Sequence, residues 1–315
     1  MNDRALVDRL SGRVVGRQRE LELVVAALAA GRHVLLEGPP GTGKSTLLRA
    51  VAEELGVGFV FVEGNAELTP ARLIGSFDPA RVLSEGYDPA VFIDGPLVTA
   101  LRDGSLLYVE EINRIPEETL NVLVTVMSER ELHVPRLGRV VASPGFGLVA
   151  AMNPFDAVGT ARISSAIYDR TCRLAVDYQS ADDEAAICRR ICADSSAGLT
   201  FDPAWLAGVV DVVRRTRSHA DVRIGSSVRG AIDLSLVAER LAGLRDRPAT
   251  DVGLGLDAAL LALSGRIRVR EGSTRSAEDI VREIWTAVFS PSAAATERGA
   301  GGGKALAPTG ALPER

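Results

Sequence analysis

Histidine, cysteine and lysine are all scarce in this chain of 315 residues, which has three histidines, three cysteines and only two lysines among 36 basic residues. The histidines are His33, His133 and His219, and the cysteines are Cys172, Cys188 and Cys192. So few histidines leave little from which to build a histidine-ligated metal site or a Ser-His-Asp triad. The cysteines are too few and too clustered for a disulfide framework, so we expect small buried thiols.

Long apolar runs and excess positive charge are also missing. The longest apolar candidate, residues 23–30, is far shorter than the roughly 18 residues that a membrane span needs. The N-terminus carries charged residues where a signal peptide would be continuously apolar. The net charge of -5 removes the electrostatic footprint of an obligate nucleic-acid binder. We therefore expect a cytoplasmic protein that has no membrane contact and for which nucleic acid is an unlikely partner.

Strand and helix patterns alternate in the first part of the chain, which predicts a parallel sheet covered by helices. Helical apolar spacing marks residues 17–30, 45–55 and 116–128. Short apolar runs predict strands at residues 33–37, 59–62, 105–109, 147–151 and 173–177.

Beyond about residue 178 the strand pattern stops and only amphipathic helical patterns follow. They cover residues 182–193, 203–217, 228–244, 255–266 and 277–289. This change predicts an α/β domain over residues 1–179 and a small all-helical domain over residues 180–289. Residues 290–315 are rich in alanine, glycine and proline, which predicts a flexible tail.

The strongest motif is a glycine-rich loop between the first predicted strand and the next predicted helix. It has the form G-x-x-x-x-G-K-[ST], whose backbone N–H groups and helix N-terminus bind phosphates. Lys44 would reach the β and γ phosphates and Ser45 would offer a hydroxyl to Mg²⁺. Lys44 is one of two lysines in the chain, so its presence here is not a matter of composition. The candidate nucleotide-binding residues are Gly38, Pro39, Pro40, Gly41, Thr42, Gly43, Lys44, Ser45 and Thr46.

Two carboxylates, Glu110 and Glu111, end the strand predicted at residues 105–109. In P-loop ATPases an acid at such a strand end holds the Mg²⁺ shell, and a further group orients the attacking water. We expect Glu110 to join Ser45 as a metal ligand and Glu111 to polarise the water. A strand that ends in two acids is weak evidence alone, and it becomes strong when the strand lies in one sheet with a P-loop.

Three further polar residues complete the candidate catalytic set. Asn153 follows the strand predicted at residues 147–151, where its amide could bind the water or the γ phosphate; a turn-forming asparagine before a proline is the alternative. Arg170 ends a short predicted helix, where it could stabilise charge on the transferred phosphate. Arg229 begins a helix of the second domain, behind serines that could cap it. A surface ion pair is the commoner role for either arginine alone.

These ordered motifs resemble the AAA+ superfamily and, within it, the MoxR family. The resemblance rests on GPPGTGKS, DGPLVTALRDGSLLYVEEINRIPEETLNVLVTVMSERE, AAMNPFD, SSAIYDRTCRL and GSSVRGAIDL, and it covers residues 13–289. It implies a parallel five-stranded sheet in the order 5-1-4-3-2, a helical lid, and an ATPase that uses ATP and Mg²⁺. It also implies a ring of identical subunits, usually six, and an insert near residues 75–97 and a β-hairpin near residues 131–146.

The resemblance assigns roles to the remaining candidates. Asn153 looks like sensor 1, Arg170 like the arginine finger that acts on a neighbouring subunit, and Arg229 like sensor 2. It implies chaperone-like remodelling or cofactor maturation of a client protein complex beside a partner that contains a von Willebrand factor A domain. Glu110 departs from the family pattern because an aspartate is expected there, and the insert shows no clear pore loop.

Two other functions stay open at this point. The first is a DNA-stimulated motor, since Arg136 and Arg139 lie in the predicted hairpin. The second is a scaffold that binds ATP but hydrolyses it slowly, which the unusual Glu110 would allow.

Overall fold

The computed structural model describes residues 3–154, 164–194 and 201–290. These residues divide into two compact units, one built from the chain up to Asp194 together with Ser227–Arg229, and one built from the rest. The predicted tail, apart from Ser290, lies outside the described residues.

The first unit is built on a parallel sheet of five strands in the order β2-β5-β8-β1-β9. The strands are β1 (His33–Glu37), β2 (Phe59–Glu63), β5 (Leu106–Glu110), β8 (Gly147–Met152) and β9 (Thr171–Ala175). Counted along the chain, this is the predicted order 5-1-4-3-2, so the P-loop AAA+ fold is confirmed. The last strand begins two residues before its predicted start.

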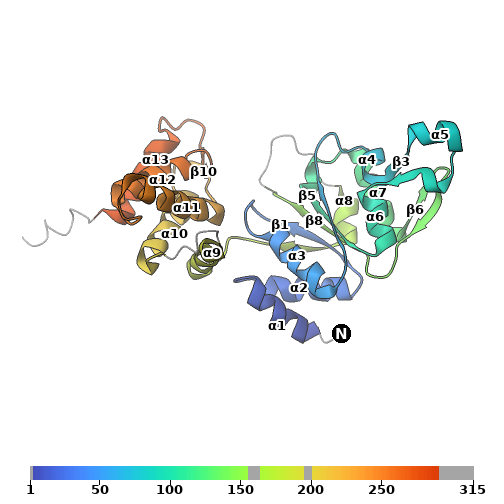
Figure 1. The fold of residues 1–315 in the computed structure, drawn as a ribbon, viewed down its shortest axis with the longest axis horizontal. Helices are drawn as coiled ribbons and strands as arrows, with labels where there is room; N and C mark the ends of the chain where they lie inside the picture. The colour runs from blue at the N-terminus through green and yellow to red at the C-terminus, as the bar shows by residue number, and fades with distance from the viewer. Residues whose placement is uncertain (1–2, 155–163, 195–200, 291–315) are drawn as a thin grey trace, which may run out of the picture. The chain divides into compact units, whose positions relative to one another are not determined.

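Helices cover both faces of this sheet, because successive side chains of a strand point to opposite faces. Val34 and Leu36 of β1 pack with the helices α1 (Asp3–Arg13), α2 (Gln18–Ala29) and α3 (Lys44–Leu55). Leu35 belongs to the opposite cluster, which includes α4 (Pro70–Ile74), α6 (Pro96–Asp103) and α7 (Glu117–Glu129). Figure 1 shows α2 and α3 on one side of the strands and α6 and α7 on the other. Both faces are therefore buried, which explains why β1 reads as a continuous apolar run.

Two antiparallel ribbons extend from the first unit. In the first, β3 (Gly75–Phe77) pairs with β4 (Phe92–Asp94), and α5 (Pro79–Glu85) and η1 (Pro89–Val91) lie between them along the chain. The second is the hairpin of β6 (Glu131–Val134) and β7 (Gly138–Val141). The guanidinium carbon of Arg136, in the hairpin turn, lies 3.6 Å from the ring centroid of Tyr87. This cation–π contact joins the turn to the segment between β3 and β4.

The helix α9 (Ala181–Asp194) groups with the first unit, which extends to Asp194. The reason is a set of contacts with the N-terminal segment, which lies far away in sequence. Arg190 Nη1 donates to the carbonyl oxygen of Arg13 over 2.7 Å. Cys188 and Cys192 of α9 are buried, and burial raises the pKa of the Cys188 thiol to about 12.

The second unit is helical, as predicted. Its helices are α10 (Pro203–Ser218), α11 (Val228–Arg245), α12 (Val252–Leu263) and α13 (Ala277–Phe289). Trp285 of α13 is buried, and its indole N–H donates to the carbonyl oxygen of Val252 over 3.1 Å. The sequence did not predict the short antiparallel pair of β10 (Val222–Ile224) and β11 (Arg268–Val269). None of the helices in the described ranges is both long and apolar enough to cross a membrane.

Gly38 follows β1 directly and is packed tightly against neighbouring backbone. A Cβ added at Gly38 would lie 1.9 Å from the carbonyl oxygen of Val176. Backbone hydrogen bonds from Gly38 N to Met152 O and from Val176 N to Glu37 O hold that backbone in place. We expect Gly38→Ala to lower the free energy of unfolding by about 1–3 kcal/mol, because the backbone must move to relieve the overlap.

Gly12 provides the matched control in chemical denaturation. It lies within α1, and a Cβ added there meets no atom within 4 Å. Gly12→Ala should raise the free energy of unfolding by about 0.5–1 kcal/mol, because alanine favours the helix. Equal effects of the two substitutions would contradict the packing argument.

Candidate functional site

The predicted phosphate-binding loop is the turn from the end of β1 to the start of α3. Gly43 has φ 82°, a left-handed conformation that glycine adopts readily, and α3 begins at Lys44. The Lys44 ammonium is buried and donates to the carbonyl oxygens of Gly38 (3.0 Å) and Pro39 (2.9 Å). Ser45 is half-buried and Thr46 is exposed in the first turn of the helix. The loop thus surrounds one cation at a helix N-terminus, an arrangement that favours phosphate.

Burial lowers the pKa of Lys44 to about 8. The carboxylate of Glu110 opposes this shift, and the positive charge of Arg17 adds to it. The ammonium is a buried cation that donates hydrogen bonds to uncharged oxygens, those of Gly38, Pro39 and Thr42. An anion bound in the loop would therefore stabilise the charged form of Lys44.

Arg17 holds the phosphate-binding loop in place, a role that the sequence did not predict. Its side chain is only 5% exposed and pairs with Glu20 over 2.7 Å. Its Nη2 donates to the carbonyl oxygen of Thr42 (3.0 Å) and to that of Asp177 (2.5 Å). Arg17 thus ties the phosphate-binding loop to the chain that follows β9. No motif marks it, because both acceptors are backbone atoms far away in sequence.

Glu37, the last residue of β1, is a second group that the sequence did not reveal. Its carboxylate is buried and accepts hydrogen bonds from Tyr168 Oη (2.9 Å) and Arg173 Nε (2.5 Å). Burial, and then the neighbouring Glu37 carboxylate, raise the pKa of Tyr168. These bonds connect the strand that carries the loop to α8 (Ser165–Arg170) and β9.

Ser45 and Glu110 converge as predicted for a metal site. Ser45 Oγ lies 3.5 Å from both carboxylate oxygens of Glu110 and 3.4 Å from the hydroxyl of Tyr108. Tyr108 and Glu110 are two residues apart on β5, so they point to the same face of the sheet. Within the described ranges no three histidine, cysteine or acidic side chains gather as a metal site. A hydroxyl and one carboxylate nevertheless fit Mg²⁺, which commonly takes few protein ligands and completes its shell with phosphate and water.

Glu111 differs from Glu110 in its backbone and in its neighbour. It has φ 52°, in the left-handed region, at the turn into η2 (Ile112–Arg114). Its carboxylate pairs with Arg114 Nε over 2.9 Å. The two acids therefore have separate surroundings, and it is Glu110 that faces Ser45.

Asn153 follows β8, which lies between β1 and β5 in the sheet. Gly38 N donates to the carbonyl oxygen of Met152 over 3.1 Å, so the end of β8 touches the start of the phosphate-binding loop. The sheet thus brings Asn153 to the same edge as Lys44 and Glu111, as its predicted position requires.

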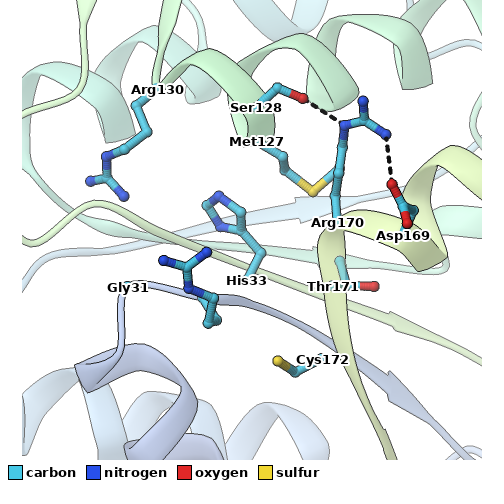
Figure 2. A pocket seen from close by; sticks show the side chains of 10 residues that line it. Gly31, His33, Met127, Ser128, Arg130, Asp169, Arg170, Thr171 and Cys172 are labelled. Atoms are coloured by element: carbon cyan, nitrogen blue, oxygen red, sulfur yellow. Dashed lines mark hydrogen bonds and ion pairs between the residues drawn. The ribbon is translucent and has the colours of Figure 1, made fainter.

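Arg170 lies at the opposite edge of the sheet. It ends α8 just before Thr171, the residue paired with His33 at the start of β1. The length of β1, about 13 Å at 3.3 Å per residue, separates this edge from the phosphate-binding loop of the same chain. Arg170 Nε donates to Ser128 Oγ (2.5 Å), and its Nη1 lies 3.8 Å from a carboxylate oxygen of Asp169, as Figure 2 shows. The structure therefore does not bring Arg170 to the other candidates of its own chain.

Arg229 is the remaining candidate. It lies at the start of α11, and Ser227, Val228 and Arg229 group with the first unit although the rest of α11 belongs to the second. Arg229 thus belongs to the same unit as the phosphate-binding loop.

Known proteins are similar to the part of the chain that carries this site. Residues 33–171 match the family model of an AAA domain of the dynein-related subfamily. An uncharacterised Staphylococcus epidermidis protein is 34% identical over 167 residues, which are 52% of this chain and 63% of that protein. The chain thus spans less than two thirds of that relative's length.

Two solved structures share the fold at low sequence identity. A Cytophaga hutchinsonii protein classed as an ATPase has a TM-score of 0.52 and 20% identity, with 89% of this chain and 92% of that chain covered. RuvB of Thermotoga maritima, a Holliday junction branch migration motor, has a TM-score of 0.53 and 19% identity, with 80% and 72% covered. Residues 33–171 are thus similar to an AAA domain, and the two solved structures share the fold of this chain.

Proposed function

We propose that this chain is a MoxR-type ATPase that couples ATP binding and hydrolysis to the remodelling of other proteins. The observation that carries the proposal is the meeting of three groups at one edge of a parallel sheet. These are the buried ammonium of Lys44, the converging oxygens of Ser45 and Glu110, and the carboxylate of Glu111. A cation, a metal-binding pair and a general base are the parts that ATP hydrolysis requires.

Each group has a distinct role in the proposed reaction. Lys44 binds the β and γ phosphates, for which it exchanges its contacts with the loop carbonyls. Ser45 and Glu110 would hold Mg²⁺, which neutralises charge on the phosphates. Glu111 accepts a hydrogen bond from the attacking water, which requires that its carboxylate turn from Arg114 toward the water. Asn153, at the same edge, orients the water or the γ phosphate, and Arg229 acts as a sensor of bound nucleotide.

The proposed assembly is a ring of identical subunits, with six as the expected number. Its support is the position of Arg170 one strand length away from the phosphate-binding loop of its own chain. An arginine at that edge can act on a nucleotide held by an adjacent subunit. The expected client is a protein complex that is being assembled or is receiving its cofactor. The expected partner of this chain is a protein that contains a von Willebrand factor A domain. A gene for such a partner beside this one would support this part of the proposal.

The DNA-stimulated motor is less well supported, because both hairpin arginines already have partners. Arg136 lies over the ring of Tyr87, and Arg139 Nε donates to a carboxylate oxygen of Glu131 over 2.6 Å. ATP turnover with and without duplex DNA at physiological salt decides between the two functions. ATP turnover measured in the protein alone tests the scaffold, because a scaffold would hydrolyse ATP slowly.

Glu111→Gln should bind ATP and retain it without hydrolysis. The amide keeps the shape of the side chain but loses the carboxylate that polarises water. Lys44→Ala is the matched variant that should lose nucleotide binding instead. Filter binding of labelled ATP and release of phosphate measure the two properties separately. Retention of ATP by Glu110→Gln, with normal turnover in Glu111→Gln, would reverse the two roles.

ATP affinity should depend on the protonation of Lys44. Because burial lowers the pKa of free Lys44 to about 8 and bound phosphate would raise it, binding above pH 8 must take up a proton. The dissociation constant should therefore rise with pH, by up to about tenfold per pH unit above about pH 8, and change little below it. Calorimetry in buffers of different ionisation enthalpy measures the proton uptake. Lys44→Arg, which stays charged, should show no uptake, and absence of uptake in the unaltered protein would refute the assignment.

Arg170 should act across a subunit boundary. Arg170→Ala should bind ATP and lose activity by roughly 10³ to 10⁵, the range for arginine fingers. A mixture of Arg170→Ala with Glu111→Gln subunits should regain partial turnover, because some sites then combine an intact Glu111 with an intact Arg170. Flat activity at all mixing ratios, with subunit exchange verified, would show that both groups act within one subunit.

A further inference from the structure

A cavity of about 460 Å³ lies at the amino edge of the sheet, on the side away from the phosphate-binding loop. Arg32, Arg130 and Arg170 line it together with His33, and Asp169 is its one acidic residue. In the view of Figure 2 the imidazole of His33 lies between Arg130 and Arg170. Three guanidinium groups therefore share one cavity with a single carboxylate.

Only Arg170 of these three arginines has an ion-pair partner in the cavity, Asp169 at 3.8 Å. Arg130 Nη2 donates to the carbonyl oxygen of Phe146 (3.3 Å), and Arg32 Nε donates to that of Ala30 (3.1 Å). Over the described ranges of the chain, the ion pairs include no carboxylate bound to Arg32 or Arg130. Each guanidinium carries five N–H donors, so carbonyl bonds leave most of its hydrogen-bonding capacity for a ligand.

His33 contributes no charge at neutral pH. Burial is the main reason that its pKa falls to about 4, and the nearby charge of Arg130 lowers it further. Its Nδ1 accepts a hydrogen bond from Leu148 N over 3.1 Å, so His33 is a neutral part of the fold. The arginines alone therefore make the cavity attractive to anions.

The backbone at Arg130 adopts a conformation that is costly for a residue with a side chain. Arg130 follows the last residue of α7 in the left-handed conformation, with φ 54°. Glycine is the usual residue at such a helix end, because a side chain there costs about 1 kcal/mol or more. A long cationic side chain at this position is consistent with a role for its guanidinium.

We propose that Arg130 and Arg32 form, with Arg170, a composite site for the γ-phosphate of ATP bound by an adjacent subunit. This inference rests on the proposed action of Arg170 across a subunit boundary, and it adds two cations to that site. Guanidinium groups bind phosphate oxygens through paired hydrogen bonds, so several can share the charge that spreads over the transferred phosphoryl group. In this arrangement Arg130 binds the reacting phosphate, and Arg32 lines the same cavity.

Arg130→Gly is the decisive substitution, because glycine suits the left-handed backbone and removes the guanidinium. We expect turnover to fall by about ten- to a hundredfold, the effect of one charged hydrogen bond. ATP affinity should stay unchanged. The free energy of unfolding should stay unchanged or rise. Arg130→Lys should retain part of the turnover, and Arg215→Ala, which removes an exposed arginine paired with Asp211, should change none of the three. Unchanged turnover in Arg130→Gly would overturn the proposal.

Subunit mixing then assigns Arg130 to one side of the boundary. Arg130→Gly mixed with Glu111→Gln should regain activity, whereas Arg130→Gly mixed with Arg170→Ala should not, because no site then holds both arginines. If Arg170→Ala recovers with Glu111→Gln but Arg130→Gly does not, only the present inference is overturned. If neither recovers, the boundary model itself fails.

A binding measurement tests the same site without turnover. ADP with aluminium fluoride mimics the transferred phosphoryl group, so its retention by the ring depends on the cations that surround that group. Arg130→Gly should retain at least about tenfold less of this complex, with unchanged affinity for ADP alone. Equal retention by the variant and the unaltered protein would overturn the proposal.

Discussion

The contact of the Lys44 ammonium with the carbonyl oxygens of the phosphate-binding loop is the interaction on which the site depends. A buried cation that contacts only uncharged oxygens is poorly compensated, so the loop is preorganised to accept an anion. The loop keeps this shape because Arg17 binds the Thr42 carbonyl from one side and β1 holds it from the other. Glu37 in turn is fixed by Tyr168 and Arg173, so the whole carboxyl end of β1 is held by side chains from distant segments.

The parallel sheet divides the chemistry between its two edges. All five carboxyl ends meet at one edge, which carries Lys44, the Ser45–Glu110 pair and Glu111. The amino ends meet at the other edge, where arginines gather around His33. Because each strand is rigid and several residues long, the two sets cannot approach each other inside one subunit. In the proposed ring this separation makes each active site a shared product of two chains.

The sequence predicted those features that depend on local pattern. The positions of the glycine-rich loop and of the acids at the end of β5, and the bounds of α13 (Ala277–Phe289), agree with the structure, because glycine spacing and the Ser276 cap are local signals. The strand order followed from the family resemblance and not from periodicity. The start of β9 was misplaced by two residues, since nothing local marks the end of α8. Arg17, Glu37 and the place of α9 depend on contacts across more than a hundred residues, which no pattern in one sequence reveals. The strands β10 and β11 of the second unit, of three and two residues, are too short for a periodic signal.

The three thiols differ in exposure, so one of them can be labelled selectively. Cys188 and Cys192 are buried and their thiol pKa is raised, so they react slowly with alkylating reagents. Cys172 is exposed and lines the arginine cavity. A maleimide fluorophore would therefore attach selectively at one point of the unaltered chain. Its emission would report on the amino edge of the sheet directly, so subunit association could be followed in solution without an engineered cysteine.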